Sequence, residues 1–175
     1  KSLFGRTDLA KYHAGAEELL NFYVDFQGGA SNRTGTQYIN RTKFKNKKAR
    51  LISFEFNIDQ TYMLEFGDEY VRFMQNKAPL IEADKTITGI TQANPAVVTS
   101  NAHGYSNGDW VYISGVAGMT EVNGEYFIAA NVATNTFELT DLDGNNVNST
   151  GYGAYTSGGV ANRVYELATP WNEEE

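Results

Sequence analysis

The spacing of apolar residues changes near residue 21, from a helical period to a strand-like one. Over residues 8–20 the apolar side chains stand three or four positions apart, which is typical of one face of an amphipathic helix. They are Leu9, Tyr12, Ala16, Leu19 and Leu20. Thr7 or Asp8 supplies a side-chain oxygen that can cap the first turn. We therefore predict a helix over residues 8–20.

Segments in which apolar and polar residues alternate follow this helix. The alternation predicts a strand from Asn21, in which Phe22, Val24 and Phe26 share one face, and four further strands over Thr36–Thr42, Leu51–Asn57, Tyr62–Phe66 and Tyr70–Met74. The last two form a hairpin closed by Gly67 and Asp68. We expect these strands to form an antiparallel sheet whose apolar face is covered by the helix.

Residues 85–163 have a different texture, with few charges and many short segments bounded by Gly, Asn and Asp. The strands predicted here are Thr86–Gln92, Ala96–Ser100, Asp109–Ser114, Glu125–Val132, Thr136–Thr140 and Gly153–Val164. Turns such as Asn107-Gly108 and Asn123-Gly124 tolerate the positive φ that tight hairpins need. Short strands at this spacing indicate a small barrel or sandwich.

The pattern thus predicts a mainly β (β-rich α+β) fold: an antiparallel sheet with one packed N-terminal helix, and an inserted small β-barrel or sandwich. We expect residues 1–84, completed by 164–175, to form the first domain and residues 85–163 the insertion. Charge agrees with this division. Residues 1–84 hold 12 Lys and Arg against 11 Asp and Glu, whereas residues 85–175 hold 2 against 10.

Composition narrows the chemistry that the chain can perform. It has no cysteine, which excludes disulfides and thiolate metal sites. No apolar run approaches the ~20 residues that span a bilayer. Neither His13 nor His103 stands in a nucleophile motif, and Asp141–Asn146 fails the EF-hand pattern at its sixth and twelfth positions. We expect no catalysis, no metal and no cofactor.

The N-terminal segments resemble a known family. Gly5-Arg6-Thr7-Asp8-Leu9-Ala10-Lys11-Tyr12, then Asn21-Phe22, Gln27-Gly28-Gly29 and Arg33-Thr34-Gly35-Thr36 stand in the order found near the start of tail nozzle (tail tubular) proteins of short-tailed bacteriophages and prophages. The resemblance implies a virion tail protein made in the bacterial host cytoplasm. It implies a ring, expected to be a hexamer in the full-length protein, that meets portal, adaptor and tail fibre proteins and forms part of the DNA-exit conduit.

The insertion resembles a second family. Ile87-Thr88-Gly89-Ile90, Asn94-Pro95-Ala96-Val97-Val98-Thr99, His103 to Asp109, Gly118 to Gly124, Phe137-Glu138-Leu139 and Tyr155 to Gly159 are similar to the first-catalytic-cysteine half-domain of ubiquitin-activating enzymes. The resemblance implies a fold rather than an activity, because a thioester needs a cysteine and the chain has none.

One basic run carries the candidate contacts of the chain. Its charged residues are Arg41, Lys43, Lys45, Lys47, Lys48 and Arg50. Three interpretations stay open: a solvated loop, a salt-sensitive contact with DNA passing through the tail, or a contact with an acidic neighbouring subunit. Two rival functions also remain. One is a receptor- or glycan-binding module that stacks sugars on exposed Tyr and Trp110, and the other is a cell-wall hydrolase, for which no carboxylate pair can be named.

Overall fold

A computed structural model describes residues 20–24, 30–57 and 60–172. The chain divides into two compact units, Lys1–Tyr38 and Ile39–Glu175. In the first unit, strand β1 (Phe22–Val24) pairs in antiparallel fashion with β2 (Ala30–Asn32). The strand expected from Asn21 is therefore present as β1. The helix predicted over residues 8–20 lies outside the described residues, apart from Leu20, so it stays a prediction.

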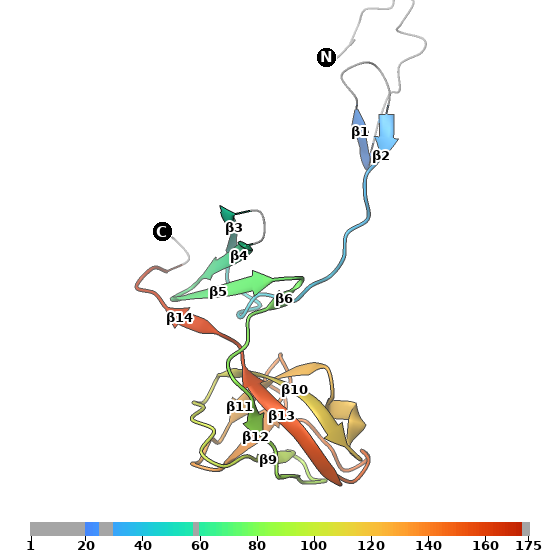
Figure 1. Ribbon diagram of the computed structural model, residues 1–175, viewed down its shortest axis with the longest axis vertical. Coiled ribbons are helices and arrows are strands. Elements are labelled where there is room, and N and C mark those ends of the chain that lie inside the picture. The colour runs from blue at the N-terminus through green and yellow to red at the C-terminus, as the bar shows by residue number, and fades with distance from the viewer. Residues whose placement is uncertain (1–19, 25–29, 58–59, 173–175) are drawn as a thin grey trace, which may run out of the picture. The chain divides into compact units, whose positions relative to one another are not determined.

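A five-stranded antiparallel sheet, here called the platform sheet, begins the second unit. Its strands are β3 (Arg50–Asn57), β4 (Gln60–Gly67), β5 (Tyr70–Gln75), β6 (Ala78–Pro79) and β14 (Glu166–Ala168). Their order is β14-β5-β4-β3, and β6 also pairs with β5. Strand β14 is far from β5 in sequence, yet Leu167 lies opposite Val71. The predicted hairpin of residues 62–74 is confirmed as β4 and β5 (Figure 1).

The strand predicted over Thr36–Thr42 is wrong, because the chain between β2 and β3 contains no strand. Side chains in this segment satisfy nearby backbone groups instead. The Asn40 carboxamide oxygen accepts a hydrogen bond from the Arg41 N–H at 2.8 Å, and the Thr42 hydroxyl donates to the Phe44 carbonyl at 3.3 Å. Such local hydrogen bonds compete with the ladder that a strand needs.

A seven-stranded sheet forms the rest of the second unit, and we call it the β-module. Its strands are β7 (Lys85–Thr86), β8 (Gly89–Ile90), β9 (Val97–Thr99), β10 (Trp110–Ala117), β11 (Glu125–Ala130), β12 (Thr136–Thr140) and β13 (Ser157–Arg163). A short 3₁₀ turn, η1 (Thr120–Val122), follows β10. The strands are ordered β7-β13-β10-β11-β12-β9-β8.

The β-module sheet curls, because its first and last strands, β7 and β8, are neighbours in the sequence. Only Ile87 and Thr88 separate these strands in sequence, yet β7 pairs with β13 and β8 pairs with β9. A flat sheet would hold its first and last strands far apart, so the sheet bends into a half-barrel. The single strand predicted over Thr86–Gln92 is therefore two short strands. The strand predicted over Thr136–Thr140 has the predicted ends, and the other four predicted strands of this region are present with shifted ends.

The interior of the half-barrel holds a closed apolar core. Sixteen buried apolar residues form it, and Phe137 is the largest of those that are less than 2% exposed. Gly118 permits the close approach of two segments around this core, because its φ is +86° and a Cβ there would overlap the Ala154 carbonyl oxygen. The described residues form mainly β-structure, and none of their helices is long and apolar enough to cross a membrane.

Candidate functional site: the basic loop and the open face of the platform sheet

The platform sheet buries its charged face. Cross-strand register places Glu65 beside Arg72 and Arg72 beside Glu166, so charges of alternating sign form one row across β4, β5 and β14. Glu65 is 1% exposed and Arg72 is 2% exposed. The Arg72 Nε donates a hydrogen bond to Glu166 Oε2 at 2.9 Å. Such charges are buried only where partners offset their desolvation.

Aromatic groups and a lysine complete this inter-sheet cluster, which we define as Lys43, Glu65, Tyr70, Arg72, Trp110 and Glu166. The Tyr70 hydroxyl donates to Glu65 Oε1 at 2.6 Å, and Lys43 forms an ion pair with Glu166. The Arg72 guanidinium lies 4.1 Å from the ring centroid of Trp110, the first residue of β10. Burial raises the pKa of Tyr70, and the bond to Glu65 raises it further.

The position of Trp110 corrects one part of the sequence interpretation. Trp110 is 2% exposed and is covered by Arg72, so its ring is not available to stack on a sugar. The cluster thus joins the platform sheet to the β-module by contacts that are buried. Neighbouring chain segments add to this joint, since Arg163 pairs with Glu82 at 2.9 Å and with Asp109 at 3.2 Å.

Carboxylates from distant parts of the chain pair with the basic loop, which we define as Arg41–Arg50. Arg41 lies 3.1 Å and Lys45 3.4 Å from Asp143 of the β-module. Lys43 pairs with Glu166 and Lys47 with Asp68. The hydrogen bond from Arg41 lowers the pKa of Asp143, and the charge of Lys45 adds to this effect. At least four of the six candidate cations therefore have an acidic partner among the described residues.

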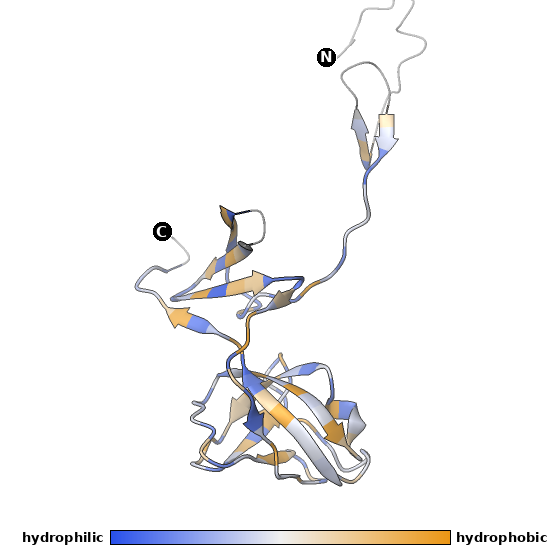
Figure 2. Ribbon diagram, in the orientation of Figure 1, coloured by the Kyte–Doolittle hydropathy of each residue, from blue (hydrophilic) through white to orange (hydrophobic). Residues whose placement is uncertain are grey.

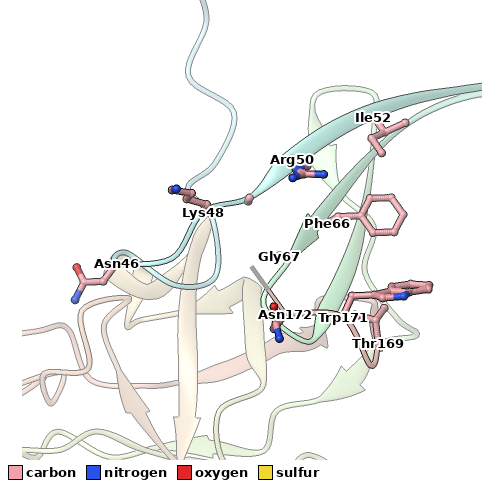
Figure 3. Close-up of a pocket in the computed structure, with 10 residues that line it drawn as sticks. Asn46, Lys48, Arg50, Ile52, Phe66, Gly67, Thr169, Trp171 and Asn172 are labelled. Atoms are coloured by element: carbon pink, nitrogen blue, oxygen red, sulfur yellow. The ribbon is translucent and has the colours of Figure 1, made fainter. Parts of the chain in front are cut away.

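Lys48 and Arg50 line a groove beside the start of β3. The groove has a volume of about 870 Å³, and Figure 3 shows its walls. It is bounded by Asn46, Lys48, Ala49, Arg50, Ile52, Phe66, Gly67, Thr169, Trp171 and Asn172. Trp171 is held in place because its carbonyl accepts a hydrogen bond from the Glu69 N–H at 2.8 Å, and its ring lies 6.4 Å from that of Phe66.

The groove continues into the second face of the platform sheet, which is apolar. Register places Arg50 beside Phe66, and Phe66 beside Val71. We define this open face as Ile52, Phe54, Leu64, Phe66, Phe73, Leu167 and Trp171. Four of these side chains, Ile52, Phe54, Leu167 and Trp171, are between 44% and 52% exposed. Apolar and polar colour alternates along β4 and β5 in Figure 2, as this two-faced arrangement requires.

Other polar residues that the sequence singled out have structural roles. His103 is buried in the β-module, where its Nδ1 accepts a hydrogen bond from the Tyr105 N–H at 3.0 Å. The Asp141 carboxylate accepts hydrogen bonds from the N–H groups of Asp143 and Asn145, as in a tight turn. Within the described residues, no three His, Asp or Glu side chains are placed to hold a metal ion. His13 lies outside the described residues.

Sequence reasoning missed the inter-sheet cluster and the groove. Glu65 and Arg72 stand at alternate positions among apolar residues, a pattern that normally indicates a solvated face. Trp171 stands near the C-terminal end of the printed chain, in a polar segment that gave no signal of its own. The one available clue was the pairing of opposite charges on neighbouring strands, and this clue requires the register to be known first.

Comparison with known proteins identifies the β-module. Residues 93–165 match the family described as the ubiquitin-activating enzyme E1 FCCH domain. The chain is also 32% identical over 105 residues to the ubiquitin-like modifier-activating enzyme 1 of Oryctolagus cuniculus. That alignment covers 57% of this chain and 9% of the rabbit enzyme, so the chain spans less than a tenth of its relative.

These matches support the resemblance predicted for the inserted segment, and neither of them supports the resemblance to tail nozzle proteins. The family match ends at Tyr165, just before β14 returns to the platform sheet. The alignment covers only a small segment of the rabbit enzyme, and it does not show that this chain is catalytic. Residues 93–165 thus form a segment similar to the FCCH half-domain of E1 enzymes, built as a curled β-sheet.

Proposed function

We propose that the chain is a structural, non-catalytic segment of a phage or prophage tail nozzle, in which the platform presents the β-module as a fixed decoration. The N-terminal motifs that resemble nozzle proteins supply the family context. In the complete protein the segment would belong to a ring, expected to be a hexamer, below the portal and adaptor. The β-module would face tail fibres or neighbouring subunits.

The inter-sheet cluster is the observation that carries this proposal. Arg72 and Trp110 come from different sheets. The contact between them offsets the desolvation of the buried arginine only where the two sheets keep one arrangement. A flexible tether would need no such contact. Fixed presentation of a small β-domain serves an assembly that must withstand the passage of DNA.

The basic loop contributes little to contact with DNA in this proposal. Its cations at positions 41, 43, 45 and 47 are paired with carboxylates of the same chain, so they offer little net charge to passing DNA. Arg50, which lines the groove, is the candidate for a contact outside the chain. DNA contact would thus be transient and independent of sequence.

Negative-stain imaging and solution mass of the complete gene product test the proposal. We expect a ring with a central channel. A compact monomer or trimer would contradict it and would favour a receptor- or glycan-binding role, for which the groove beside Trp171 rather than Trp110 would be the place to search. Hydrolysis of cell-wall polymer by the purified chain would also contradict it.

A further inference from the structure

Strand β3 has an edge that pairs with nothing in the described part of the chain. On its inner side it pairs with β4 from Arg50 to Asn57, and it stands last in the order β14-β5-β4-β3. All eight of its residues are exposed. A long edge strand with large apolar side chains is a template for another strand, because its outward N–H and C=O groups are free to extend the ladder.

The side chains of β3 that belong to the open face define what a neighbouring strand would meet. Arg50, Ile52 and Phe54 project to the same face at two-residue intervals. Arg50 and Ile52 also line the groove, together with Phe66 and Trp171 (Figure 3). A guanidinium between apolar walls suits a carboxylate that is flanked by aliphatic or aromatic side chains.

We propose that β3 binds an extended polypeptide segment of another protein, which adds to the sheet as an antiparallel strand. The segment carries apolar side chains at two alternate positions, opposite Phe54 and Ile52, followed two residues later by an acidic side chain opposite Arg50. Charge complementarity selects the acidic residue, and the free edge supplies the backbone hydrogen bonds. The antiparallel sense continues the pairing of every strand in the platform sheet.

Charge argues for this occupant over two others. A nucleic acid needs several free cations along a track, but the basic loop is largely paired with Asp68, Asp143 and Glu166. A second copy of this chain would bring another net charge of −7 toward the first. An acidic, apolar strand instead meets a surface where Arg50 stands beside apolar groups.

A designed peptide tests the proposal on the 175-residue chain. The probe is fluorescein-labelled Thr-Val-Thr-Ile-Thr-Glu-Thr, and its binding is followed by fluorescence anisotropy. Arg50→Glu should weaken binding about tenfold and should improve binding of the same peptide with lysine in place of glutamate. Arg33→Glu makes the same change of charge outside the groove and should leave both affinities unaltered. This exchange of preference distinguishes a direct contact from a variant that fails to fold.

Two N-methylated peptides test the mode of binding. They carry methyl groups at alternate residues and differ by a shift of one position, so only one of them blocks the amides that face β3. One should lose binding and the other should retain it, whereas docking as a helix would respond to both. Binding of a single-stranded DNA probe in place of the peptide, or sedimentation as a dimer with no peptide bound, would overturn the proposal. The inference does not rest on the tail function, and its failure would leave the ring test unaffected.

Discussion

The β-module and the platform sheet solve the problem of burial in opposite ways. The β-module curls so that its apolar side chains, Phe137 among them, face one another. The platform sheet buries a row of charges, Glu65 and Arg72 among them, and leaves Ile52 and Phe54 half-exposed. A closed core stabilises a domain by itself, whereas a sheet with an exposed apolar face is suited to association. The β-module thus buries its apolar side chains within itself, whereas the platform sheet leaves apolar side chains exposed for contacts with another protein.

The largest difference in stability is expected when one phenylalanine in each region is replaced by alanine. Phe137→Ala should lower the free energy of unfolding of the β-module by about 3–5 kcal/mol, because a fully buried ring leaves a cavity. Phe54→Ala makes the same chemical change on a side chain that is 48% exposed and should alter stability by less than about 1 kcal/mol. Urea unfolding followed by circular dichroism measures both. Similar losses in the two variants would contradict the comparison.

Next in size is the effect of removing the buried arginine. Arg72→Met should cost about 3 kcal/mol, because it leaves the carboxylate of Glu166 without its buried partner and uncovers Trp110. Arg50→Met is the matched control on the open face and should cost little. In a Trp171→Phe background, tryptophan fluorescence reports Trp110 alone among the chain's two tryptophans. Unchanged emission together with unchanged stability would show that the cluster does not join the sheets.

Structural features that depend on residues close together in the sequence were predicted better than features that depend on residues far apart. Turns in the β-module are encoded locally, by pairs such as Asn123-Gly124, and the strands around them were found at nearly the right positions. The split of residues 85–90 into β7 and β8 was missed, because it depends on pairing with β13 and β9, which lie far away in the chain. Local pattern cannot specify which distant strand will be the partner.

The platform sheet shows a second limit. Alternation predicted an apolar face for this sheet, and the register places Ile52, Phe54 and Phe66 on that face and Glu65 and Arg72 on the other. We expected the helix over residues 8–20 to cover the apolar face, but that helix lies outside the described residues, and alternation normally assigns the charged face to solvent. Here Trp110 and Lys43 come from other segments to cover the charges. The basic loop illustrates the same point, since its partner Asp143 lies about a hundred residues away.

A smaller effect compares one buried tyrosine in each region. Burial raises the pKa of Tyr105 in the β-module and of Tyr70 in the platform sheet. Both should stay protonated at pH values where an unfolded tyrosine ionises, so stability is full below about pH 10 and is lost as the pH rises above it. Tyr105→Phe should remove part of this alkaline loss. It should also cost about 1 kcal/mol at neutral pH, because the hydroxyl donates to the Ala161 carbonyl at 2.9 Å.

Tyrosinate absorbance during an alkaline titration measures this effect alongside urea unfolding. Tyr38→Phe alters an exposed tyrosine and serves as the control. Should Tyr105→Phe and Tyr38→Phe give the same alkaline stability curve, the buried hydroxyl would have no part in the pH dependence.

The smallest effect concerns the surface contact between the basic loop and the β-module. The hydrogen bond from Arg41 lowers the pKa of Asp143, so the contribution of this contact is present above the ordinary carboxyl pKa near about 4 and is lost as the pH falls through the lower folded value. Asp143→Asn should flatten the acid limb of the stability curve slightly, and added salt should reduce the difference because the pair is exposed. Urea unfolding at several pH values between about 5 and 3 measures it. Asp84→Asn removes a carboxylate that accepts a hydrogen bond from Asn162 at 2.7 Å and provides the control for the change in net charge. A difference between wild type and Asp143→Asn that is indifferent to salt would mean that the loop is held by something other than this ion pair. The two regions would then be joined by the inter-sheet cluster and by the ion pairs of Arg163.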